Sequence, residues 1–285
     1  MKKTIFFILL LFLLEINQFL LSSKKLNIVH KTKSAGILDK LPWKFNFEPY
    51  TSEIKHNNGK IFYYGSYHNV SLHHPQFRDI EDKWNSFKPD MAFSEGEEWP
   101  LEKSKEAAIK RYGEQGLVRY LADRDNVKIK CAEPKRRCEM SFLLKQFSPS
   151  EIKIFYVLRQ IIINRDIFKK NLDVIDYVKI YLMNLSWNVP FNRSPNTVDE
   201  LSICIKKLLP DLKDWTKIGE KYFMDITRPG NFLAKINVQV NKYRDKFMVK
   251  KILSALKKGK KVFFVVGKSH VFNQERRLRS IIHEL

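Results

Sequence analysis

The chain has 285 residues, of which 44% are hydrophobic, and a formal net charge of +21. This length and apolar content allow a substantial core and exclude an intrinsically disordered protein. Lysines and arginines are scattered through nearly every segment, whereas a nucleic-acid surface needs a patch or stripe of them, so nucleic-acid binding is not expected. Cys131, Cys138 and Cys204 leave one cysteine unpaired at best and specify no disulfide framework, although a bridge between Cys131 and Cys138 stays open.

The amino terminus has the pattern of an export signal. Two lysines precede an apolar run from Ile5 to Leu14, like the basic and apolar regions of a signal peptide. The run is short for a membrane span, but Ile16 to Leu21 can extend it past Glu15 into an uncleaved anchor. We therefore expect residues 1–23 to be a signal peptide or a signal anchor. The protein is then exported, whether periplasmic, secreted or held at the membrane through this segment.

Short runs rich in Val, Ile, Phe and Tyr predict buried strands, and helical spacing of apolar residues between the first three predicts helices at Gln76–Phe87 and Leu101–Asp123. Alternating strands and helices are typical of parallel βαβ units, whose right-handed crossovers align the carboxyl ends of the strands. The sequence therefore predicts an α/β fold with a mostly parallel sheet and flanking helices. The predicted strands are Lys60–Gly65, Asp90–Glu95, Val127–Glu133 and Lys261–Gly267.

The strand pattern disappears between residues 148 and 230. Ser148 and Glu151 have the spacing of a capping box before a strongly apolar helix, and Thr197 and Glu200 repeat that spacing. We expect a helical insert or cap here.

The insert divides the predicted α/β core into two parts, residues 24–147 and 231–285. In the second part, a long helix at 231–258 leads to the last strand, and another helix at 273–285 closes the chain.

Chemically active side chains stand at the end of each predicted strand. The first and last strands run into the pattern Gly-x-x-His, which ends at His68 and His270, while the other two end at Glu95 and Glu133. Ligands of open α/β sheets bind outside the carboxyl ends of the strands, so these groups are expected to meet in one crevice. Imidazole and carboxylate together bind a divalent metal or transfer protons.

Other polar residues have simpler interpretations. His73 and His74 fit a polar loop or the rim of the crevice better than a third metal ligand. Ser66 and Ser269 lie beside the histidines, but neither stands in a G-x-S-x-G elbow, so a serine nucleophile is not expected.

The motifs resemble those of the TraB/TIKI family and, more distantly, of the erythromycin esterase and ChaN-like proteins that share its core. The family pattern includes Arg-Asp followed after two residues by Met, which Arg244, Asp245 and Met248 fit; Ser66 replaces a threonine that many relatives have. The matching segments occur in the family's order and span most of the predicted core. They are GSYH at 65–68, FKPDMAFSEG at 87–96, CAEP at 131–134, YRDKFMVKKI at 243–252 and VFFVVGKSHVF at 262–272.

The resemblance implies a hydrolase-like site that is metal-dependent in the TIKI branch. It implies His68, His270 and Glu95 as ligands of a divalent ion such as Mn, Co or Zn, and Glu95, Glu133 and Arg244 as catalytic residues. Arg244 is able to hold a carboxylate fork-to-fork, either that of a substrate or that of Glu95. Asp245 is expected to cap or pair locally, because adjacent residues on a helix point in different directions.

Three functions follow from these observations. The first is an exported hydrolase that acts on a peptide bond or on an ester of a small molecule. The second is a protein of the same core that binds haem or another ligand through the histidines without turnover. The third is a protein that binds membranes or other surfaces through its basic charge, with a vestigial site.

Overall fold

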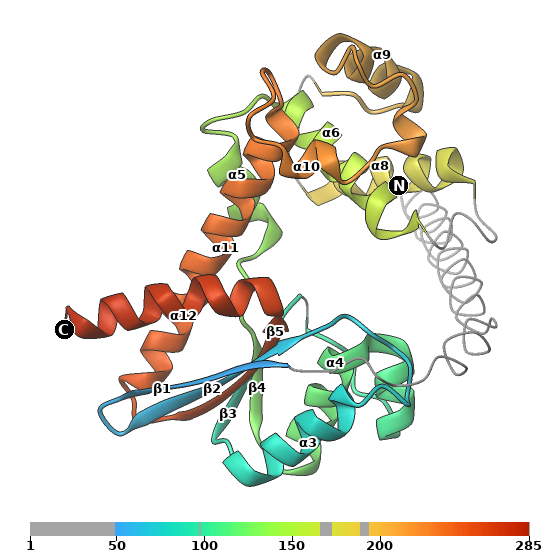
Figure 1. The fold of residues 1–285 in the computed structure, drawn as a ribbon. Helices are drawn as coiled ribbons and strands as arrows, with labels where there is room; N and C mark the ends of the chain where they lie inside the picture. The colour runs from blue at the N-terminus through green and yellow to red at the C-terminus, as the bar shows by residue number, and fades with distance from the viewer. Residues whose placement is uncertain (1–48, 97, 166–172, 189–193, 285) are drawn as a thin grey trace, which may run out of the picture.

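The computed structural model describes residues 49–96, 98–165, 173–188 and 194–284, so the predicted signal segment, 1–23, lies outside the described residues. These residues form an α/β lobe and a helical lobe (Figure 1). The lobes are connected by the long helix α11 and by the segment between β4 and α5. Among the described residues no helix is both long and apolar enough to span a membrane.

The α/β lobe contains a five-stranded sheet with the order β1-β2-β5-β3-β4. β1 is antiparallel to β2, and all other neighbouring pairs are parallel. The predicted α/β fold with a mostly parallel sheet and flanking helices is therefore confirmed. The strands are β1 (Tyr50–His56), β2 (Gly59–Ser66), β3 (Met91–Ser94), β4 (Lys128–Cys131) and β5 (Lys261–Gly267).

Strand β1 was not predicted from the sequence. It lies at the edge of the sheet, and Ile54 is its one buried residue. Such a strand lacks the apolar pattern of the central strands. A turn signal was present, because Asn57 and Asn58 form a two-residue hairpin loop in which Asn57 has a φ of 52°.

Both faces of the sheet are covered by helices. Along β5, Val262, Phe264 and Val266 pack against α11 (Phe232–Leu256) and α12 (Lys268–His283). The alternate residues, Phe263 and Val265, pack against α3 (Gln76–Phe87) and α4 (Lys105–Arg124). The central strand is therefore apolar on both faces, and the open positions of the sheet are at its strand ends.

The predicted helical insert contains only helices and loops in its described part. The apolar faces of these helices form a core of their own together with the first half of α11. The helices of this lobe are α5 (Arg136–Leu143), α6 (Pro149–Ile163), α8 (Val174–Asn188), α9 (Val198–Leu208), the short 3-10 helix Trp215–Lys217 and α10 (Lys221–Met224).

The sequence signals for helix starts are present in the structure. Ser148 and Glu151 form both reciprocal hydrogen bonds of the predicted capping box. Thr197 caps α9 by accepting from the Glu200 N–H, but the Glu200 carboxylate accepts from Asn196 N and not from the cap residue itself.

The last helix differs from its prediction. α12 begins at Lys268, directly after β5, and not at residue 273.

All three cysteines are free thiols, so the Cys131–Cys138 bridge is absent.

Candidate functional site

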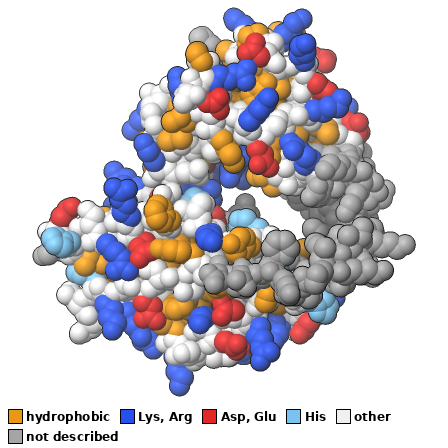
Figure 2. Space-filling view, in the orientation of Figure 1, with side chains coloured by type: hydrophobic (Ala, Val, Ile, Leu, Met, Phe, Trp, Pro, Cys, Tyr) orange, Lys and Arg blue, Asp and Glu red, His pale blue; other side chains and the backbone are white. Residues whose placement is uncertain are grey.

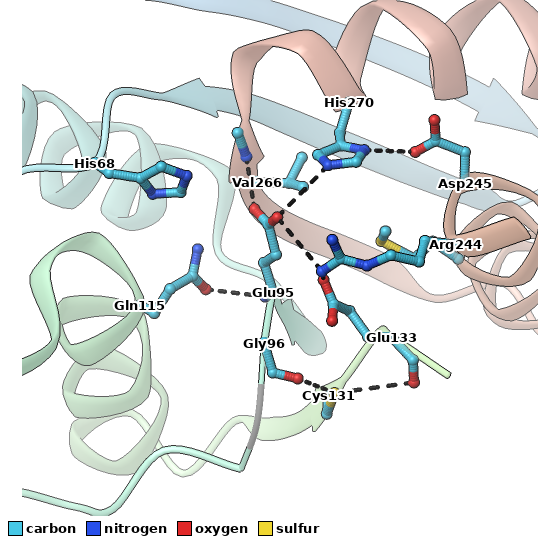
Figure 3. Close-up of polar contacts among 12 residues, drawn as sticks. His68, Glu95, Gly96, Gln115, Cys131, Glu133, Arg244, Asp245, Val266 and His270 are labelled. Atoms are coloured by element: carbon cyan, nitrogen blue, oxygen red, sulfur yellow. Dashed lines mark hydrogen bonds and ion pairs between the residues drawn. The ribbon is translucent and has the colours of Figure 1, made fainter. Parts of the chain in front are cut away.

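The carboxyl ends of β2, β3 and β5 bring His68, Glu95 and His270 together (Figure 3). Glu95 directly follows β3, and its Oε2 accepts a hydrogen bond from the Gly267 N–H at 2.8 Å. The Glu95 N–H donates to Gln115 Oε1 at 3.0 Å. Glu95 is thus fixed at its backbone by α4 and at its carboxylate by the end of β5.

Gly267 lies at the centre of this group. A Cβ atom at Gly267 would lie 3.6 Å from Glu95 Oε2, 3.6 Å from His68 Nε2 and 3.7 Å from His270 Cδ2. The glycine therefore leaves open the position on which the predicted imidazoles and carboxylate converge. This convergence could be anticipated because parallel strands end at one edge of a sheet.

His270 lies in the first turn of α12 and is largely buried, with a side chain that is 13% exposed. Its Nδ1 is 2.8 Å from Asp245 Oδ1, and its Nε2 is 3.7 Å from Glu95 Oε1. The same Asp245 oxygen accepts from Gln274 Nε2 at 2.9 Å. The expectation that Asp245 caps or pairs locally is therefore wrong, since it holds a histidine of the neighbouring helix.

His68 occupies the open side of the site. Its side chain is 73% exposed, and its Nδ1 lies 2.7 Å from Glu114 Oε1. The hydrogen bond to Glu114 raises the pKa of His68 above its ordinary value, and burial only partly opposes this effect. The exposed side chain of His68 leaves this side of the site accessible. Figure 2 shows a hollow between the two lobes with histidine side chains at its edge.

Arg244 and Glu133 lie next to Glu95, on the side opposite His68 (Figure 3). The guanidinium pairs most closely with Glu133, while its Nη2 is 4.0 Å from Glu95 Oε1 and its Nε is 3.9 Å from Glu139 Oε2. Burial lowers the pKa of Arg244, and the surrounding negative charge opposes that effect. Arg244 is therefore occupied by the protein's own carboxylates, and its first partner is Glu133.

The remaining sequence candidates lie outside this group. His74 Nδ1 accepts from the Gln76 N–H at 3.3 Å, and burial lowers the pKa of His74. His73 and Ser269 are exposed. The buried Ser66 hydroxyl lies 3.4 Å from Glu114 Oε1, so it is not presented to a substrate.

The site is acidic although the protein is strongly basic. Among the described residues the guanidinium of Arg244 stands between the site's carboxylates, Arg136 and Arg159 interact with the charge of Glu139, and the nearby Lys251 Nζ donates to the backbone carbonyls of Cys131 and Glu133. The excess negative charge around Glu95 favours a bound cation. The carboxylates are Glu95, Glu114, Glu133, Glu139 and Asp245.

The donor set fits a divalent metal by its chemistry. Histidine ligands commonly donate their second ring N–H to a carboxylate, and both His68 and His270 have a carboxylate at Nδ1. Their Nε2 atoms then remain available beside Glu95, as in sites with two histidines and one carboxylate. Across the described ranges, however, no three ligating side chains already stand close enough together to hold an ion.

Sequence reasoning missed Glu114 and Gln115. Both lie within a segment predicted as a regular helix, on which neighbouring residues point in different directions. Gly113 and Gly116 flank them and were the available signal, because glycine within a helical pattern marks a break or a close approach.

The fold and the site define an α/β protein with a centre of histidines and carboxylates at the carboxyl ends of parallel strands. Comparison with family models, with curated proteins and with solved structures finds no match.

Proposed function

We propose that this chain is an exported TraB/TIKI-like hydrolase that cleaves a peptide or ester bond with the help of a divalent metal. The observation that supports the proposal best is the paired arrangement around Glu95. Two imidazoles approach it, each with Nδ1 held by a buried carboxylate, Glu114 for His68 and Asp245 for His270. Export rests on the pattern of residues 1–23 alone.

His68 Nε2, His270 Nε2 and Glu95 would hold the metal, which is expected to be Mn, Co or Zn. When bound, such an ion polarises the scissile carbonyl and lowers the pKa of a water molecule toward neutrality. Glu95 has one oxygen fixed by the Gly267 N–H and the other directed toward His270. A Cβ atom at Gly267 would lie 3.6 Å from Glu95 Oε2, and we propose that Glu95 accepts a proton from a water molecule in this open position.

Arg244 and Glu133 support this centre from the side opposite His68. The guanidinium offsets part of the negative charge around Glu95 and holds Glu133 in an ion pair. A substrate enters from the side of His68, whose side chain is exposed. His270 and Arg244 form the buried side of the site, with side chains that are 13% and 11% exposed.

The test is metal analysis of the full chain, purified in detergent because of its apolar amino terminus. The parent is compared with a His68→Ala, His270→Ala double variant and with His73→Ala, in which an exposed loop histidine is removed. We expect near-stoichiometric metal in the parent and the control after incubation with Mn, Co or Zn, and none in the double variant. Hydrolysis of ester and peptide libraries by the loaded parent would then identify the bond.

Equal metal content in the parent and the double variant would refute the proposed site. A parent that takes up no metal but shows a Soret band on haem titration, lost in the double variant, would instead support the haem-binding alternative.

A further inference from the structure

Helix α4 is broken where it passes the site. Gly113 has a φ of 59° and a ψ of −138°, far from helical values. A Cβ atom there would lie 2.6 Å from the Asn69 carbonyl oxygen, in the residue that follows His68. Gly113 is therefore required both by its backbone conformation and by its contact with the loop that carries His68.

The break turns two consecutive side chains toward the sheet. Glu114 is 2% exposed and Gln115 is 5% exposed, although neighbouring residues on a regular helix point about 100° apart. Gln115 accepts from the Glu95 N–H and donates to the Val265 carbonyl at 3.2 Å. The two residues after the break thus contact the ends of β2, β3 and β5.

Glu114 is the hydrogen-bond partner of an exposed imidazole. Among the described residues it is the one side chain bonded to the ring of His68, at 2.7 Å from Nδ1. The Ser66 hydroxyl lies 3.4 Å from the same carboxylate oxygen. In neutral His68, a proton on Nδ1 that is donated to Glu114 leaves a lone pair on Nε2. That Nε2 lies beside the open position at Gly267.

The geometry points to Glu114 as a positioning residue for the proposed site. It fixes His68 in the tautomer with a free Nε2 and directs that atom toward Gly267, and the break at Gly113 places Glu114 where it can do so. The inference rests on the proposed function for the use of Nε2 as a ligand. Glu114 serves His68 as Asp245 serves His270, but from a different helix and on the exposed side of the site.

The first test determines directly which ring nitrogen of His68 carries the proton. The full chain with ¹⁵N-labelled histidine rings is examined by NMR without metal at about pH 8.5, where an ordinary imidazole is neutral. His68→Gln assigns the signals of His68. We expect a protonated Nδ1 and an unprotonated Nε2 for His68 in the parent and in Glu102→Gln, which removes a partly buried carboxylate paired with the exposed Arg111. Glu114→Leu should shift the proton to Nε2.

The second readout is affinity for Zn²⁺ or Mn²⁺, measured by competition with a chelating dye. Loss of a carboxylate behind a ligating histidine weakens metal binding by about 10- to 100-fold, and we expect this range for Glu114→Leu but not for Glu102→Gln. Glu114→Gln, which keeps an acceptor oxygen, should recover part of the affinity.

The outcomes separate this inference from the proposed function. A proton on His68 Nε2 in the parent would overturn the role of Glu114 even if Glu114→Leu failed to fold, and so would an unchanged tautomer in a folded Glu114→Leu. The expected tautomer change in a protein that binds no metal would support the positioning role and refute the metal-dependent function.

Discussion

Arg244 makes its closest ion pair with Glu133, and Glu95 lies farther away, at 4.0 Å from the guanidinium. All three side chains are nearly buried, at 11% to 13% exposure. Removing one partner of a buried pair leaves a charge without compensation, which costs more than the pair contributes.

Replacing Arg244 with methionine should therefore destabilise the fold strongly. We expect the free energy of unfolding, measured by urea titration, to fall by about 3–5 kcal/mol. Arg111→Met is the matched control, since it breaks a more exposed pair with Glu102 and should cost about 1 kcal/mol or less. Equal losses in the two variants would contradict the buried role of Arg244.

Gly267→Ala should impair the site and spare the fold. The φ of −51° and ψ of 137° suit alanine, and the new methyl group would make ordinary contacts with Glu95, His68 and His270. We expect the free energy of unfolding to stay the same or to rise by up to about 1 kcal/mol, as it does where alanine fits the backbone conformation of a glycine. Metal binding should weaken by about tenfold, which is about 1.4 kcal/mol.

Gly219→Ala controls for the general effect of this substitution, because its Cβ would meet only Lys221 Cγ, at 3.9 Å. Unchanged metal affinity in Gly267→Ala would show that ligands do not bind at the open position.

The hydrogen bond between His68 and Glu114 should make stability depend on pH. The pKa of folded His68 is raised above 6.5, so the stabilisation is complete below about pH 6.5 and is lost as the pH rises through the folded value. The advantage of the parent over His68→Asn should therefore be larger at pH 5.5 than at pH 9. It should stay below about 1 kcal/mol, because the imidazole is largely exposed.

Urea unfolding at the two pH values measures this difference, with His73→Asn as the control for loss of an exposed loop histidine. An advantage that grew with pH would reverse the expected sign and contradict the interaction.

The capping box at the start of α6 should contribute measurably to stability. Ser148 Oγ accepts from the Glu151 N–H, and Glu151 Oε2 accepts from the Ser148 N–H at 2.8 Å. Ser148→Ala should lower the free energy of unfolding by about 1 kcal/mol in a urea titration. Ser141→Ala, within α5, should have little effect or a slight stabilising one, because alanine has the higher helix propensity. Similar losses in both variants would argue against a specific capping contribution.

The central strands could be predicted because they are buried on both faces and are therefore apolar without interruption. β5 has its predicted bounds, and β2 extends one residue beyond its predicted bounds at each end. β4 is shorter than predicted and ends at Cys131, because the sheet no longer pairs where the chain turns toward the helical lobe at Glu133. An edge strand such as β1 carries a weaker apolar signal and was missed.

The site residues that follow the ends of strands could be predicted from the sequence. His68, Glu95 and His270 follow strands, and the topology of a parallel sheet brings them together. Glu114 could not be predicted, because its direction depends on a helix break that involves a distant loop. Asp245 was misjudged for a related reason: α11 carries it toward α12 while Arg244 faces Glu133, so both neighbours on one helix serve the same site.

Helix α11 belongs to both lobes. Its first half, from Phe232 to Val240, packs into the helical lobe, and its last part, from Met248 to Leu256, packs against the sheet. Arg244 and Asp245 lie between these two anchored parts. With a fixed rise of about 1.5 Å per residue, a continuous helix keeps the distance between its two anchored parts constant. Any tilt of the helical lobe about the sheet must therefore bend α11 or displace Arg244 and Asp245, so that lobe motion and the geometry of the histidine centre are mechanically coupled.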